Sequence, residues 1–357
     1  MGFSVGIVGL PNVGKSTLFK TLTKKEIDIS NYPFCTIDPN VGIVKVPDER
    51  LEKLTVFSKS AKTIPTAIEF VDIAGLVEGA HEGEGLGNKF LANIREVDMI
   101  AHIVRGFPSG KITHVHDKVD PAHDVDVINT ELILADLDTV DKRLSKIEKE
   151  VRSGDKKAIT LKAVLEKYKV ALEDEKMANS VVLDEKEKEV VKELQLLTNK
   201  PVLYVVNVSE EQKAAELDAI LPDIKNKIFL PIQFELELRE LEAEEAEVFR
   251  AEAELDPKVS SLEDLTTRCY DLLGLITFLT TGTDETRAWT IKKDSTAPQA
   301  GSAIHSDFEE RFIRASVINW QKLIEAGSLG NAAEKGLLRT EGKTYIVQDG
   351  DVIEFKI

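Results

Sequence analysis

The sequence predicts an α/β fold in which a doubly wound sheet carries an inserted antiparallel helical arm and is followed by a smaller α+β module. Three observations support this prediction. Short apolar runs alternate with helical patterns early in the chain, a long charged helical stretch interrupts the alternation, and β-like segments return near the C-terminus. Alternating strands and helices are typical of parallel sheets covered on both faces. A chain of 357 residues is also long enough for two or three domains.

The first strand is expected over residues 3–10, where a short apolar run ends in a glycine-containing loop. A helix is expected from Lys15 to Leu22, because the apolar residues of this segment fall on one helical face. Similar apolar runs predict further strands of the same sheet over residues 66–73, 99–104 and 201–206.

Residues 129–197 are charged and helix-prone, with apolar side chains at helical spacing from Leu132 to Ile147. Residues 153–155, Ser-Gly-Asp, interrupt the pattern before a second helical stretch over 156–172. We interpret the stretch as an inserted antiparallel arm, and the alternative is that these helices cap the sheet. The predicted domains are an α/β domain over 1–128 and 199–274, the arm over 129–198, and a C-terminal module over 275–357.

The remaining segments are assigned by pattern. Residues 234–255 alternate Glu with Leu and Ala, which indicates an exposed acidic helix. In the C-terminal module we expect strands over 287–291, 344–347 and 352–355 and a helix over 307–318. The dipeptide Asp349-Gly350 predicts a hairpin turn.

Composition limits the function classes. The formal net charge of −17 argues against indiscriminate nucleic-acid binding by the whole surface. Two cysteines far apart in sequence fit a reducing compartment, and no apolar run is long enough to span a bilayer. We therefore expect a cytoplasmic protein with no membrane partner and no sequence-specific DNA partner, and we expect a monomer.

One local exception to the acidic character lies within the predicted arm. Residues 141–169 hold ten Lys and Arg against five Asp and Glu. Such a charge run is either a solvated helical face or a contact surface for RNA.

Residues 9–17 read Gly-Leu-Pro-Asn-Val-Gly-Lys-Ser-Thr, a complete phosphate-binding loop of the form GxxxxGKS. Glycines allow successive backbone N–H groups to face the phosphates, and the helix that follows adds its positive dipole end. Lys15 would neutralise the β- and γ-phosphates, and the Ser16 hydroxyl would ligate Mg²⁺. The loop lies between a predicted strand and a predicted helix, which is the context that the motif requires.

Two later features add a metal site. Asp72 ends the next predicted strand and suits a water-mediated contact to Mg²⁺, while the backbone N–H of Gly75 can point at the γ-phosphate. Thr36 supplies a hydroxyl that could reach the same metal from a turn-rich segment. In this order after a phosphate loop, the features indicate the GTPase class, whose switch loops are ordered by the γ-phosphate.

The means of hydrolysis is less conventional. Leu76 occupies the place where Ras-like enzymes have a glutamine that orients the attacking water. His114 is a candidate for that role, although a lone histidine is more often structural. Asn12 could assist by holding a potassium ion (K⁺) against the phosphates.

The guanine-recognition motif Asn-Lys-x-Asp is altered. Asn207 follows the strand over 201–206, but Val208 replaces the lysine and Glu210 replaces the aspartate. A site built for paired hydrogen bonds discriminates strongly, so this change should weaken the preference for guanine. A third base-contacting motif would fall at residues 233–235, where Gln-Phe-Glu does not match it.

With these residues identified, the chain resembles the YchF (Obg-like ATPase) family over essentially its full length. The resemblance rests on GLPNVGKST, NYPFCTIDPNVG, FVDIAGLVEGAHEGEGLGN, the sequence NVSE, and RAWTIKKDSTAPQAGSAIHSDFEERFIRA. The last of these resembles a TGS module, a ubiquitin-like β-grasp domain. The resemblance implies a P-loop NTPase fold with a helical arm, a preference for ATP over GTP, a requirement for Mg²⁺, and association with the ribosome or a ribosomal subunit.

Carried over by position, the resemblance also implies roles for single residues. It places Ser16 and Thr36 on Mg²⁺, Asn207 and Val208 beside adenine, and His114 at the family's proposed catalytic histidine. Cys35 matches a cysteine beside the first switch, which makes redox sensitivity conceivable. The phosphates would be bound by Asn12, Val13, Gly14, Lys15, Ser16 and Thr17.

Three functions remain open at this point. The first and preferred one is an ATP-hydrolysing switch that acts on ribosomes. The second is a GTPase of similar role, which Val208 and Glu210 disfavour. The third is a nucleotide-gated binding module whose hydrolysis is incidental, an alternative that Leu76 keeps open.

Overall fold

A computed structural model describes residues 2–23, 39–73, 88–107, 120–191 and 193–357. Its first sheet has six strands in the order β2-β4-β1-β5-β6-β7, all parallel except β2, which runs antiparallel to β4. The predicted strands at 3–10, 66–73, 99–104 and 201–206 are confirmed as four of these. The bounds are β1 Ser4–Val8, β2 Val41–Lys45, β4 Ala67–Asp72, β5 Met99–Arg105, β6 Val202–Asn207 and β7 Lys227–Leu230.

The neighbouring interior strands β5 and β6 are buried along their whole length, as expected for a parallel sheet with both faces covered. Helix α1 contacts β1, β2 and β4, while α4 contacts β5 and α10 contacts β6. This arrangement confirms the predicted α/β fold. The helices outside the arm in this part are α1 Lys15–Thr23, α3 Asn88–Glu96, α7 Ala214–Ala219, α8 Ile232–Leu238, α9 Ala243–Glu252 and α10 Leu262–Leu272.

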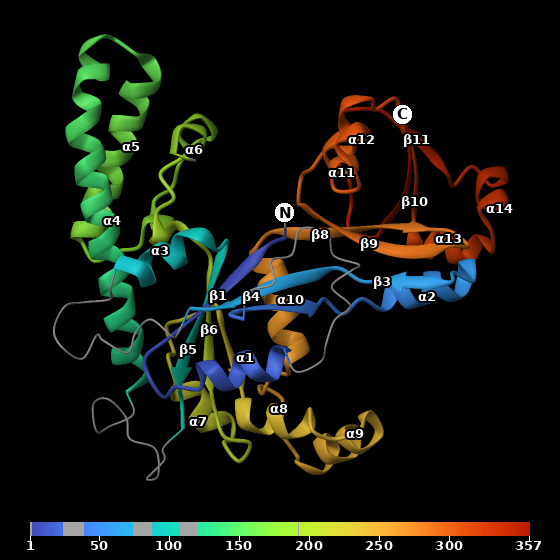
Figure 1. The fold of residues 1–357 in the computed structure, drawn as a ribbon, viewed down its shortest axis with the longest axis horizontal. Coiled ribbons are helices and arrows are strands. Elements are labelled where there is room, and N and C mark those ends of the chain that lie inside the picture. The colour runs from blue at the N-terminus through green and yellow to red at the C-terminus, as the bar shows by residue number, and fades with distance from the viewer. Residues whose placement is uncertain (1, 24–38, 74–87, 108–119, 192) are drawn as a thin grey trace.

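The helical arm consists mainly of α4 (Pro121–Arg152) and α5 (Lys156–Glu173), which stand out from the sheet in Figure 1. Gly154 separates them in the left-handed region at φ +81°, and Asp155 caps α5 by accepting a hydrogen bond from the amide of Lys157 at 2.9 Å. The shorter elements η4 (Ala178–Ser180), α6 (Glu185–Val191) and η5 (Leu197–Asn199) lead back to the sheet.

Helix α4 serves two cores. Its first turns bury Val125, Ile128 and Leu132 in the core of the sheet, and its later turns bury Val140 and Ile147 in the core of the arm. The helix begins before residue 129, where we expected the arm to start, so the predicted boundary at 128/129 falls inside one continuous helix.

The C-terminal module is a second six-stranded sheet in the order β11-β10-β12-β8-β9-β3. Small helices accompany it, as expected for an α+β module. The bounds are β8 Leu275–Thr281, β9 Glu285–Lys292, α11 Ala297–Ser302, α12 Ser306–Glu310, β10 Arg314–Asn319, α13 Trp320–Ala326, α14 Leu329–Glu334, β11 Arg339–Glu341 and β12 Asp351–Lys356.

Three expectations for this module are wrong. The helix predicted over 307–318 ends at Glu310, and residues 314–319 form β10, which pairs with both β11 and β12. Residues 344–347 contribute only an isolated bridge at Ile346, and β12 pairs with β10 and β8, so Asp349-Gly350 is not the turn of a hairpin. Tertiary strand pairing overrides the local pattern at these places.

The segment between β2 and β4 belongs structurally to the C-terminal sheet. Strand β3 (Lys62–Ile64) pairs in parallel with β9, and α2 (Glu49–Ser58) buries Leu51 and Leu54 against apolar residues of that module. Figure 1 shows α2 and β3 in blue beside the orange and red C-terminal elements. The two modules are therefore joined by a strand and a helix from the first domain as well as by the chain after α10.

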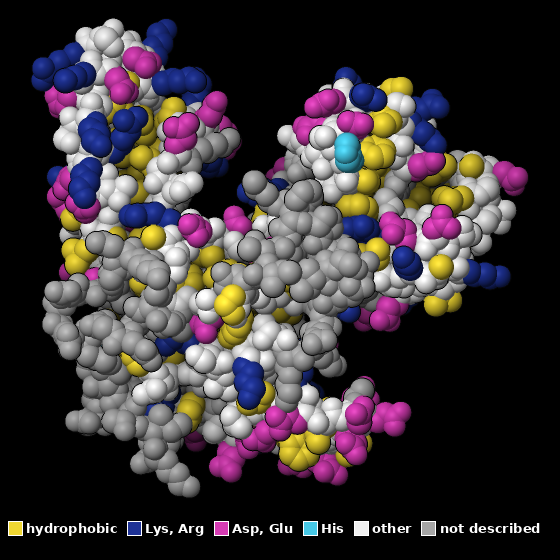
Figure 2. All heavy atoms as spheres, in the orientation of Figure 1, with side chains coloured by type: hydrophobic (Ala, Val, Ile, Leu, Met, Phe, Trp, Pro, Cys, Tyr) yellow, Lys and Arg dark blue, Asp and Glu magenta, His cyan; other side chains and the backbone are white. Residues whose placement is uncertain are grey.

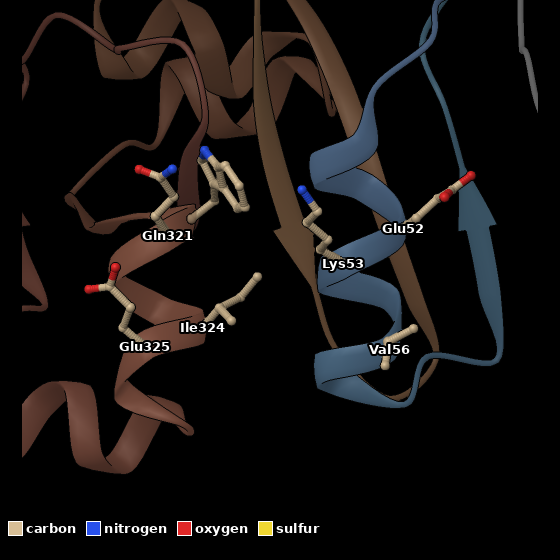
Figure 3. Close-up of a pocket in the computed structure, with 7 residues that line it drawn as sticks. Glu52, Lys53, Val56, Gln321, Ile324 and Glu325 are labelled. Carbon is tan, nitrogen blue, oxygen red and sulfur yellow. The ribbon is translucent and has the colours of Figure 1, made fainter.

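Helices α2 and α13 face each other across a cavity of about 540 Å³. Figure 3 shows Lys53 and Ile324 directed into the space between them. The Lys53 ammonium lies 5.6 Å from the centroid of the Trp320 ring, which places it at cation–π distance. Three residues before Lys53 on α2, Arg50 binds Asp349, whose second oxygen accepts the amide of Thr277 at 2.9 Å.

No helix within the described ranges is both long enough and apolar enough to cross a membrane.

One buried carboxylate holds the segment that connects the arm back to the sheet. Asp136 on α4 is 1% exposed and accepts hydrogen bonds from the amides of Leu197 and Thr198 at 2.8 and 2.7 Å. The Thr198 hydroxyl donates to the same carboxylate at 2.7 Å and accepts the amide of Ala178 at 3.0 Å. A single side chain thus satisfies several buried polar groups at the base of the arm.

We predict that Asp136→Ala speeds hydrogen exchange at the amides of Leu197 and Thr198 by about 100-fold. Two buried N–H groups would lose their acceptor, at a cost of about 3 kcal/mol. Native-state hydrogen exchange measures the effect. Asp141→Ala is the matched control, because Asp141 lies on α4 like Asp136 but forms an exposed ion pair with Lys169 of α5. Unchanged exchange in Asp136→Ala would contradict this account of the junction.

Candidate nucleotide-binding site

The phosphate loop connects β1 to α1 at the carboxyl end of the sheet, and its glycines are required by close packing. A Cβ atom at Gly9 would lie 2.4 Å from the carbonyl oxygen of Ile103 on the neighbouring strand, and Gly9 has φ +153°. Asn12 adopts the left-handed conformation at φ +62°, which asparagine tolerates better than most residues. The loop therefore has the curled backbone that the sequence motif predicts.

Asn207, at the end of β6, holds this loop. Its side-chain Nδ2 donates to the carbonyl oxygen of Val13 at 3.0 Å, and its Oδ1 accepts the amide of Ile232 at 3.3 Å. The side chain is 7% exposed, and a Cβ at Gly14 would come within 2.5 Å of its Nδ2. In this structure the side-chain amide of Asn207 supports the loop, and its expected place beside the base stays a prediction.

Lys15 is directed back into the loop. Its ammonium donates to the carbonyl oxygen of Leu10 at 2.5 Å, and the residue is 7% exposed. Burial lowers the pKa of Lys15 to about 8, and the nearby negative charge of Asp72 opposes this shift. A buried cation that donates to a neutral carbonyl oxygen is suited to bind phosphate oxygens, which would compensate its charge more fully.

The predicted metal ligands within the described ranges have suitable chemistry. Ser16 lies in the first turn of α1 with an exposed side chain, and Asp72 ends β4 close enough to Lys15 to influence its pKa. A hydroxyl and a carboxylate are oxygen ligands of the kind that Mg²⁺ prefers alongside phosphates and water. The donor set thus fits Mg²⁺. The predicted Thr36, Gly75 and His114, like Cys35, lie outside the described residues.

On the side of the site expected to hold the base, the carboxylate at position 210 is not buried. Val208 is 3% exposed, and its amide donates to the carbonyl oxygen of Leu230 at 3.2 Å, whereas Glu210 is exposed. Of residues 233–235, only Gln233 is exposed, because Phe234 and Glu235 are buried in α8. Glu235 is paired with Arg250 at 2.6 Å, so it serves the packing of α8 on α9.

Two residues near the site were not predicted from the sequence. Gln212 follows β6, accepts the amide of Ser209 at 2.9 Å and donates to the carbonyl oxygen of Gly106 at 3.0 Å, which ties the turn after β6 to the end of β5. His102 lies in the middle of β5 in register with Val8, and burial and then the charge of Lys15 lower its pKa to about 3. The only sequence signal for His102 is a histidine within an otherwise apolar strand.

Comparisons with known proteins agree on the family. A family model described as a 50S ribosome-binding GTPase matches residues 4–167, and a model for the C-terminal domain of YchF GTPases, described as a protein of unknown function, matches residues 275–357. A solved structure described as the Schizosaccharomyces pombe YchF GTPase superposes with a TM-score of 0.87 at 35% identity, covering 99% of this chain and 98% of that one.

Two curated relatives are similar over their whole length. The protein named ribosome-binding ATPase YchF from Bacillus subtilis (strain 168) is 50% identical over 365 residues, covering 100% of this chain and 99% of the relative. The protein of the same name from Escherichia coli O157:H7 is 47% identical over 361 residues and covers 99% of both chains. The matched folds, the intact phosphate loop and full-length identity at this level lead to one conclusion: this chain belongs to the YchF family of P-loop nucleotide triphosphatases.

Proposed function

We propose that this chain is a Mg²⁺-dependent, ATP-binding and ATP-hydrolysing switch that associates with ribosomes. The observation that carries the proposal is the phosphate loop, in which Asn207 holds the backbone and the ammonium of Lys15 donates to the carbonyl oxygen of Leu10. The names of the similar bacterial proteins, ribosome-binding ATPase, support both the nucleotide and the partner.

The proposed roles on the phosphate side follow from position and charge. Lys15 binds β- and γ-phosphate oxygens in place of the Leu10 carbonyl oxygen, and the backbone of residues 12–17 surrounds the phosphates. Ser16, Thr36 and, through water, Asp72 would hold Mg²⁺, which supplies neutralising charge to the phosphate oxygens. Asn12 is the proposed site for K⁺ beside the phosphates.

For hydrolysis, the backbone N–H of Gly75 is proposed to contact the γ-phosphate, and His114 is proposed to orient the attacking water. Both assignments rest on the sequence and the family resemblance. They are consistent with Leu76, which has no group that could orient water.

The base side supports ATP over GTP. Guanine recognition in GTPases relies on a carboxylate that accepts two hydrogen bonds from the base, and here the corresponding Glu210 is exposed while Val208 replaces the lysine that packs on the ring. GTP is therefore the disfavoured nucleotide, and a GTPase of the same role is the alternative function. The third alternative is a binding module whose hydrolysis is incidental.

A single-turnover experiment tests the proposed function. With ³²P-labelled ATP and excess protein, we expect slow hydrolysis by the chain alone and at least tenfold faster hydrolysis when purified ribosomes are added, because a partner can complete a site that lacks a water-orienting glutamine. Cosedimentation in the same samples reports binding. Hydrolysis that stays negligible although ribosomes are bound would favour the nucleotide-gated binding module instead.

The lowered pKa of Lys15 predicts proton uptake on nucleotide binding. In the free protein Lys15 has a pKa of about 8. A bound triphosphate favours the charged form and raises this pKa, so at pH 8 binding should take up about 0.5 proton, and at pH 7 close to none. Calorimetry of Mg·ATP binding in two buffers with different ionisation enthalpies measures this number. Equal uptake at both pH values would contradict the proposed role of Lys15.

A further inference from the structure

The search for surfaces outside the nucleotide site leads to a groove at the base of the arm. It has a volume of about 740 Å³ and lies between α3, α4, α5 and the segment around α6. Its floor includes apolar side chains such as Leu91 and Leu161, while Arg95, Lys142, Arg143 and Lys146 line it. Asp138 and Glu193 are the carboxylates that line it, so cations outnumber anions in this groove.

Most cations that line this groove have no carboxylate ion pair within the described residues. Lys142 pairs with Asp138 at 2.5 Å. The ion pairs found within the described part of the chain include none for Arg95, Arg143 or Lys146, and Arg95 only donates to the hydroxyl of Thr139 at 3.4 Å. Elsewhere on the arm, Arg152, Lys162, Lys167 and Lys169 have carboxylate partners, whereas Lys149, Lys156 and Lys157 have no ion pair within the described residues. What distinguishes the groove is that it brings Arg95, Arg143 and Lys146 from two helices together in one concave surface, although the charge of Arg95 also acts on the buried Asp136.

The geometry suits a regular polyanion. Arg143 and Lys146 are three residues apart on α4, and Lys142 and Lys146 are four apart, so these side chains neighbour one another along one helical face. Arg95 adds a cation from α3, a separate helix that precedes α4 in the chain. A row of cations along a groove matches the evenly spaced phosphates of a nucleic-acid backbone better than it matches a single small anion.

The charge distribution over the rest of the molecule favours the same surface. The chain carries a net charge of −17, so a polyanion is repelled by most of the protein and is attracted only locally. Figure 2 shows Lys and Arg side chains in dark blue over the arm, whereas Asp and Glu in magenta gather over α8 and α9 at the opposite end. A ribosome exposes RNA phosphates over much of its surface, so RNA is the polyanion that we expect this groove to meet.

We propose that the groove lined by Arg95, Arg143 and Lys146 binds RNA phosphates and is the surface through which the arm contacts ribosomal RNA. This inference rests on the proposed association with ribosomes and specifies its contact surface. It also distinguishes the groove from the tip of the arm, where Lys156 and Lys157 lie outside the groove.

The test compares two double charge reversals on the full-length chain. Arg143→Glu with Lys146→Glu changes the groove, and Lys156→Glu with Lys157→Glu makes the same change of charge at the start of α5. Fluorescence anisotropy with a labelled 20-nucleotide single-stranded RNA and cosedimentation with purified ribosomes report binding. Circular dichroism and binding of a fluorescent ATP analogue confirm that each variant is folded.

We expect the groove variant to lose at least tenfold in affinity for both RNA and ribosomes, and the tip variant to change less than threefold. The wild-type affinity for the RNA should fall with salt with a logarithmic slope of about −2, as expected for three cations on a single strand. An equal loss in both variants would overturn the proposal, since it would mean that only the overall charge of the arm matters.

Two further outcomes separate the groove from the proposed function. If the groove variant binds ribosomes like the wild type, the groove is not the contact, while the association with ribosomes stands. If the groove variant loses ribosomes although the wild type never binds the RNA probe, the groove contacts a ribosomal protein, and the assignment to RNA is overturned. If the wild-type chain binds neither, the proposed function fails together with this inference.

Discussion

The carboxamide of Asn207 is the contact on which the geometry of the nucleotide site depends. It joins three separate parts of the chain, because it donates to Val13 in the phosphate loop, accepts from Ile232 at the start of α8, and itself ends β6. A buried amide with both ends satisfied fixes its neighbours closely, since breaking either hydrogen bond leaves a buried polar group without a partner. The phosphate loop, the end of β6 and the start of α8 are thus held together by one side chain.

The phosphate side and the base side of the proposed site differ in how firmly their groups are held. The phosphate side is built from backbone and from a buried cation, Lys15, whose burial lowers its pKa and leaves it ready for a stronger anionic partner. The base side has Val208 buried and Glu210 exposed, so it lacks the fixed carboxylate on which guanine selection depends. In the proposed function the phosphate loop therefore supplies the affinity for triphosphates, and selectivity between bases is left to weaker contacts.

Much of this was predictable from sequence, for identifiable reasons. The phosphate loop and the strands β4, β5 and β6 were predicted because a motif with tight backbone requirements and long apolar runs leave few alternatives. Strand β10 was missed because its six residues pair on both sides with strands distant in sequence, which local pattern does not reveal. For the same reason the pairing of β3 with β9 was not foreseen. The orientation of Asn207 required the tertiary structure, although its position was predicted from the motif.

The most direct test of the account is an equilibrium competition in which Mg·ATP and Mg·GTP displace a fluorescent ATP analogue from the wild-type chain and from Asn207→Ala. The account predicts that ATP binds the wild type at least tenfold more tightly than GTP, a difference of about 1.4 kcal/mol. It also predicts that Asn207→Ala weakens both nucleotides by the same factor of about ten, because the loop that binds their shared phosphates loses its support. Tighter binding of GTP, or a substitution effect confined to one nucleotide, would contradict it.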